Sequence, residues 1–148
     1  MKTRLDTLAS KLWGRIKALP ATAQREIVLA ACRHAIDESG TQDPFLLSTF
    51  EIMSRGETLS ADMQMTLKER AEQLDRSYLD ANAAEEPDAE DVALMAAEAN
   101  AAYALSFAAN ESDIDAVAEC LYEASCTSFD DDSFWNMIEM LTSEAEGS

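Results

Sequence analysis

The chain has 148 residues, of which 29 are acidic and 11 are Lys or Arg, so its formal net charge is −18 at pH 7. Hydrophobic residues make up 47% of it, which excludes a disordered composition, and four Gly and three Pro are too few for a fold rich in turns. Abundant Ala, Leu, Glu and Met, with little Val, predict an all-α protein. We expect a compact bundle of about seven helices, more than about 60% helical, forming a single domain over residues 1–148.

Apolar residues recur at helical spacing through the first half of the chain and predict four helices there. Asp43 is a good N-cap, and Pro44 suits the first helical position, so the third of these helices should begin there. Ser60 is the expected N-cap of the fourth, and Gly40 and Gly56 are expected to end the second and third. The four predicted helices cover residues 6–19, 22–38, 44–55 and 60–83.

A break at residues 85–88 separates these helices from three more. The fifth, over 89–109, is alanine-rich and is expected to be the central, most buried helix. Its predicted inner face consists of Val92, Met95, Ala96, Ala99, Tyr103 and Phe107. Ser112 and Asp115 resemble a capping box that would start a sixth helix, ending near residue 124. The seventh begins near Asp132, and we expect its order to be lost after Ser143.

The helical periodicity also predicts which large side chains lie in the core. The predicted core residues are Phe50, Leu67, Leu74, Met95, Tyr103, Leu121 and Ile138.

The three cysteines, Cys32, Cys120 and Cys126, are odd in number and widely spaced, which does not indicate a disulfide framework. We expect small buried side chains in a reducing compartment, with a redox-sensitive thiol near Cys126 as the alternative. Charged and polar residues interrupt any apolar core of a signal peptide, and the longest apolar runs, 27–32 and 92–97, are too short to cross a bilayer. The expected location is the cytoplasm, with no membrane partner.

Charge divides the chain into two halves. All 11 Lys and Arg lie between Lys2 and Arg76, together with 11 Asp and Glu, whereas residues 77–148 contain 18 acidic residues and no basic one. We therefore distinguish a neutral half, 1–84, from an acidic half, 88–148. The acidic half is either a solvated face that keeps the protein soluble or the binding site of a basic protein, which would offset its self-repulsion. Direct binding of nucleic acid by the acidic half is disfavoured, because it would approach phosphates.

No catalytic or metal-binding motif is apparent. His34 and Glu38 could share a metal, but two ligands are too few for a zinc site, and a surface pair on one helix is favoured. Asp130, Asp131 and Asp132 do not form an EF-hand calcium loop, because Phe134 and Trp135 occupy ligand positions. We expect no catalytic residue, no metal and no cofactor.

The most suspect acidic cluster joins the start of the sixth helix to the start of the seventh. A short connection between these helices could bring both groups to one end of the bundle, and aromatic residues beside them would serve as interface anchors. The candidate partner-binding residues are Asp113, Asp115, Glu119, Phe129, Asp130, Asp131, Asp132 and Trp135. The alternative is that these acids only stabilise the starts of their own helices.

Three stretches follow one another in a recognisable order. LPATAQREIVLAACRHAI at 19–36 is rich in Ala and contains a Cys. DPFLLSTFEIMSRGETLSADMQ at 43–64 starts with Asp-Pro and contains Arg-Gly-Glu, and VALMAAEANAAYALSFAA at 92–109 is alanine-rich. In this order the chain resembles a helical family of immunity proteins from bacterial polymorphic-toxin systems. The resemblance implies a non-enzymatic protein that binds and blocks a cognate toxin.

These observations favour an acidic helical binding protein that neutralises or sequesters a basic protein partner by occlusion. It would act as an immunity protein, an inhibitor or a nucleic-acid mimic, with no bond made or broken. The alternative is a structural or adaptor bundle whose acidity serves solubility only. A third hypothesis is an enzyme whose active-site residues lie far apart in the sequence.

Overall fold

The computed structural model describes residues 10–110, 113–127 and 131–147. Within these ranges there are seven helices and no strand, and 81% of the described residues are helical. The expected all-α bundle is therefore confirmed. The helices are α2 (Ser10–Lys17), α3 (Ala21–Ser39), α4 (Pro44–Ser54), α5 (Ala61–Asn82), α6 (Ala89–Ala108), α7 (Ile114–Ser125) and α8 (Asp131–Glu146).

Local capping signals begin and end the helices largely where the sequence predicts. The Asp43 carboxylate accepts a hydrogen bond from the Phe45 N–H at 2.9 Å, at the start of α4. Ser60 caps α5 in the same way through the Met63 N–H. Gly40 ends α3 with φ at 63°, in the left-handed region that favours glycine.

The predicted capping box at the start of the sixth helix is wrong. Asp113 is the N-cap of α7, and its carboxylate accepts a hydrogen bond from the Asp115 N–H at 3.0 Å. Asp is as good an N-cap as Ser, so either residue can start a helix, and the observed helix begins one position later. Ser112 itself lies outside the described residues.

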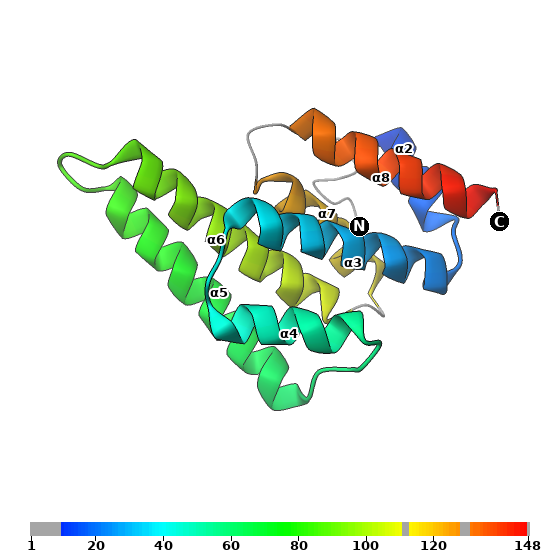
Figure 1. Cartoon of the computed structure of the whole chain (residues 1–148), viewed down its shortest axis with the longest axis horizontal. Helices are drawn as coiled ribbons and strands as arrows, with labels where there is room; N and C mark the ends of the chain where they lie inside the picture. Colours follow the sequence, from blue (N-terminus) through cyan, green and yellow to red (C-terminus); the bar gives the residue numbers. More distant parts are fainter. Residues whose placement is uncertain (1–9, 111–112, 128–130, 148) are drawn as a thin grey trace.

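The helices are arranged around α6 (Figure 1). α5 and α6 form a long antiparallel hairpin whose tip projects beyond the other helices. α6 also packs against α3, α4 and α7, and α3 packs against α7 and α8. α8 closes one side of the bundle against α2 and α3.

The central position of α6 is confirmed, but its predicted inner face is not. Its buried residues are Ala97, Ala99, Ala101, Ala102, Ala104, Leu105 and Ala108. Only Ala99 belongs to the predicted face, and the other five residues of that face are half-buried. Neighbours pack on several sides of α6, and the small alanine side chains let them approach closely. A single apolar stripe is therefore a poor guide to this helix.

The hydrophobic core draws on both halves of the chain. Of the predicted core residues, Leu67, Leu121 and Ile138 are fully buried. Phe50, Leu74 and Tyr103 are half-buried and pack against the core. Met95 is half-buried and lies outside the main cluster.

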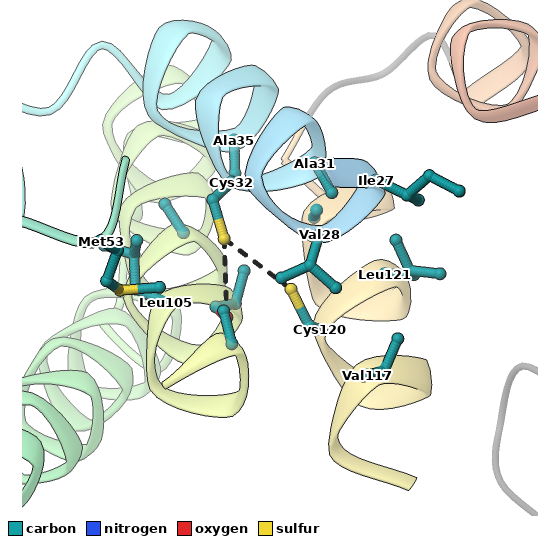
Figure 2. Packing of buried hydrophobic residues seen from close by; sticks show 14 of the residues in the cluster. Ile27, Val28, Ala31, Cys32, Ala35, Met53, Leu105, Val117, Cys120 and Leu121 are labelled. Carbon is teal, nitrogen blue, oxygen red and sulfur yellow. Dashed lines mark hydrogen bonds between the residues drawn. The ribbon is translucent and has the colours of Figure 1, made fainter. Parts of the chain in front are cut away.

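Two of the cysteines meet in this core, between α3, α6 and α7 (Figure 2). The Cys32 and Cys120 sulfur atoms lie 3.8 Å apart, and the Cys32 thiol donates a hydrogen bond to the Ala104 carbonyl at 3.9 Å. The Cys32 contact and burial raise the pKa of the Cys120 thiol well above its ordinary value. The expectation of buried cysteines is therefore confirmed for this pair, whereas Cys126 is exposed.

The C-terminal helix is longer than the sequence suggests. α8 continues to Glu146 rather than ending near Ser143, because Arg15 of α2 holds its last turn. The Arg15 guanidinium donates to the Glu146 carboxylate at 2.8 and 3.1 Å and to the Ser143 hydroxyl at 3.0 Å. The hydrogen bond from Arg15 lowers the pKa of the Glu146 carboxyl below its ordinary value.

Candidate protein-binding surface

Acidic side chains are concentrated at the tip of the α5–α6 hairpin. We define the acidic tip as the six exposed carboxylates of residues 80–91, which are Asp80, Glu85, Glu86, Asp88, Glu90 and Asp91. Asp88 also caps α6, accepting hydrogen bonds from the Glu90 and Asp91 N–H groups. Among the described residues, no Lys or Arg forms an ion pair with these six carboxylates. The tip therefore presents its negative charge directly to solvent.

Two large apolar side chains lie exposed on the same hairpin. Leu79 near the end of α5 and Leu94 near the start of α6 each have 53% of their surface exposed. Their surroundings differ, because Leu94 is flanked by two surface hollows, neither of which is lined by Leu79.

The hollows beside Leu94 lie between α6 and the ends of other helices. One, of about 210 Å³, lies between α6 and the ends of α3 and α7. It is lined by Glu38, Ala93, Leu94, Ala96, Ala97, Cys126 and Thr127. The other, of about 340 Å³, lies between α6 and residues 39–42 after α3. We call the two hollows together the Leu94 groove. Exposed Leu94 and half-buried Met95 give this groove an apolar floor.

The charged groups of the Leu94 groove are negative. Glu38 lines one hollow and Glu98 the other, and no Lys or Arg lines either. The Glu98 carboxylate is fixed by a hydrogen bond donated by the Thr41 hydroxyl at 2.6 Å. The carboxyl ends of α3 and α7 also meet here, with no basic residue in either last turn. Helix carboxyl ends carry partial negative charge, so the groove favours a cation.

The structure separates the two acidic groups that the sequence placed together. Asp113 and Asp115 lie at the start of α7 and Glu119 near its middle, whereas α8 begins beside the end of α7 (Figure 1). The 12 residues of α7 span about 18 Å at the usual helical rise, so the acids at the starts of α7 and α8 lie at opposite ends of α7. The expected clustering at one end of the bundle is therefore not found.

The remaining candidate residues are placed as follows. Asp131 begins α8, and Asp132 is exposed in its first turn. Trp135 is half-buried against the core, its ring 4.9 Å from that of Phe134. Phe129 and Asp130 lie outside the described residues.

Sequence reasoning missed the Leu94 groove. One signal was available, since Glu90, Asp91 and Leu94 lie within one turn of a helix and so share a face. This signal is weak, because single apolar side chains are common on protein surfaces. The hollows on either side could not be inferred, because residues about 50 positions earlier and about 30 positions later build them.

The predicted surface pair of His34 and Glu38 is wrong. His34 is half-buried, its ring 5.0 Å from that of Phe134, and its Nε2 atom is buried with no hydrogen-bond partner among the described residues. α8 packs over this part of α3 and turns the histidine towards the core. In the part of the chain that the structure describes, no three His, Cys, Asp or Glu side chains gather as a metal site would require. No described helix has the length and apolar character needed to cross a membrane.

Comparison with protein-family models, curated proteins and solved structures found no match to this chain.

Proposed function

We propose that this protein binds a basic protein through the acidic tip and the acidic half that follows it, and blocks that protein by occupying its functional surface. The observation that carries the proposal is the acidic tip, six exposed carboxylates without an ion pair to any described Lys or Arg. Charge of this kind, concentrated on one projecting element, has a cost in self-repulsion that a basic partner would relieve.

The mechanism is electrostatic steering followed by steric occlusion. A field of one sign raises the rate of encounter with a partner of the opposite sign and suppresses wrong partners. The projecting hairpin can enter a concave basic surface of the partner, such as a groove that binds nucleic acid. Its carboxylates would then occupy the positions of the phosphates. The resemblance to immunity proteins of toxin systems favours a toxin as the partner and the cytoplasm as the place of action.

A capture experiment with charge-matched variants tests the proposal. The tip variant carries Glu85→Gln, Glu86→Gln, Glu90→Gln and Asp91→Asn, and the control variant carries Asp37→Asn, Asp62→Asn, Glu69→Gln and Glu72→Gln. All eight residues are exposed, and each variant loses four negative charges. We expect wild type and control to retain the same basic protein from the source cell at low salt and to release it at high salt. The tip variant should retain little of it.

The solubility hypothesis makes a different prediction for the same variants. If the acidity only keeps the protein soluble, the location of the removed charges has no effect on capture. Equal capture by the tip variant and the control would therefore contradict the proposal and favour that alternative.

A further inference from the structure

We propose that the Leu94 groove is the docking site for a basic segment of the partner, an amphipathic helix that carries Lys or Arg beside apolar side chains. This inference rests on the proposed function and adds the place and the chemistry of the contact. The apolar side chains of the segment enter the hollows on either side of Leu94, and its cationic groups reach Glu38 and Glu98.

The shape of the groove fits side chains. Its hollows have volumes of about 210 and 340 Å³. A water molecule takes up about 30 Å³ of liquid volume, so each hollow has room for several carbon atoms of an apolar side chain. Leu94, exposed between the hollows, becomes buried when both are filled, as expected of an interface anchor.

The charge of the groove selects a basic segment over an acidic or purely apolar one. Glu38 and Glu98 stand one in each hollow, and Glu90 and Asp91 lie one helical turn before Leu94. The carboxyl ends of α3 and α7 add partial negative charge at the same place. An acidic segment would be repelled, and an uncharged one would leave these carboxylates without counter-charge.

Cys126 offers a direct readout of whether the groove is occupied. It lines the smaller hollow and is exposed, whereas Cys32 and Cys120 are fully buried. In the folded protein, neutral iodoacetamide should therefore alkylate Cys126 first, and a bound segment should slow that reaction.

The test uses a fluorescein-labelled synthetic helix of leucine and lysine at amphipathic spacing, with a leucine and glutamate helix as the charge control. Anisotropy measures binding, and the alkylation rate of Cys126 measures where the peptide binds. We compare Leu94→Ala with Leu79→Ala, because both leucines are 53% exposed and only Leu94 borders the hollows. Circular dichroism verifies that both variants keep the helical fold.

We expect the lysine peptide to bind at low salt and to slow Cys126 alkylation at least about fivefold at saturation, and the glutamate peptide to do neither. Leu94→Ala should weaken binding by about tenfold and Leu79→Ala by less than about twofold.

If the lysine peptide binds but leaves Cys126 fully reactive, or if both variants bind it equally, the docking site is wrong and the proposed function stands. If the lysine peptide does not bind at low salt, the docking site is wrong, and the proposed function is decided separately by capture with the tip variant. Protection of Cys126 by raising the concentration of the protein alone would show that a second copy fills the groove and would overturn the inference.

Discussion

At the scale of single residues, side chains between α3, α6 and α7 form a large part of the hydrophobic core. Ile27, Leu105 and Leu121 are fully or almost fully buried and belong to one cluster with the two core cysteines. Burial of a large aliphatic side chain contributes roughly 1.5–3 kcal/mol, and a cavity left by its removal adds to the loss. Truncation in this region should therefore be far more damaging than truncation on the surface.

Leu121→Ala should lower the free energy of unfolding by about 2–5 kcal/mol, because it leaves a cavity between α3, α6 and α7. Met140→Ala is the control, since Met140 is 62% exposed and its truncation should change stability by less than about 0.5 kcal/mol. Urea denaturation followed by circular dichroism measures both. Equal losses in the two variants would show that the assigned core is wrong.

At the scale of helices, signals that act within a few residues were predicted well. Asp43, Pro44, Ser60 and Gly40 each start or end a helix where the sequence indicates, because a cap needs only its own backbone and the next turn.

Features that depend on distant segments were predicted poorly. The last turn of α8 is held by Arg15, more than 120 residues away in the chain. The buried side of α6 depends on which helices pack around it, and the Leu94 groove exists only because α3 and α7 end beside α6. Local periodicity carries none of this information.

The start of α4 allows the contribution of a cap to be separated from that of an ion pair. Asp43 caps α4 through the Phe45 N–H and also pairs with Arg70. Asp43→Ala removes both interactions, whereas Asp43→Asn removes the charge and keeps a capping oxygen. The alanine variant should be less stable than the asparagine variant by about 1 kcal/mol in thermal or chemical denaturation. Equal stabilities would mean that the cap contributes nothing.

Arg15→Ala should release the last turn of α8, because the guanidinium links α2 to Ser143 and Glu146. Hydrogen exchange at residues 143–146 should accelerate, while Arg55→Ala, which removes only local contacts to Glu51 and Glu57, should leave α8 unchanged. Acid should also release this turn, measured as a lower protection of residues 143–146 relative to the intrinsic exchange rate at the same pH. The folded pKa of Glu146 lies below its ordinary value of 4.5, so its contribution is present above pH 4.5 and is lost as the pH falls through the lower folded value. Unchanged exchange in Arg15→Ala would contradict this role.

At the scale of the whole molecule, the net charge of −18 affects both the stability of the folded state and the attraction of partners. Self-repulsion destabilises the folded state, and the same field attracts cationic partners. Both effects are screened by salt, since the Debye length is about 10 Å at 0.1 M ionic strength and about 30 Å at 0.01 M.

The melting temperature should therefore rise with sodium chloride between about 0.01 and 0.3 M, by differential scanning fluorimetry. The rise should be smaller in the tip variant, because four of the carboxylates that repel one another are neutral there. A melting temperature that falls with salt would mean that favourable ion pairs, and not repulsion, dominate the folded state.

The central claim is that the acidic tip, together with the acidic half that follows it, is a binding surface for a basic partner. The association rate with the captured partner tests this claim most directly. That rate should be measured by stopped flow over a range of salt concentrations for wild type, the tip variant and the matched control. We predict that the tip variant associates about tenfold more slowly than wild type at low salt and has a shallower salt dependence, whereas the control stays close to wild type. Identical rates and salt slopes for the tip variant and the control would contradict the claim.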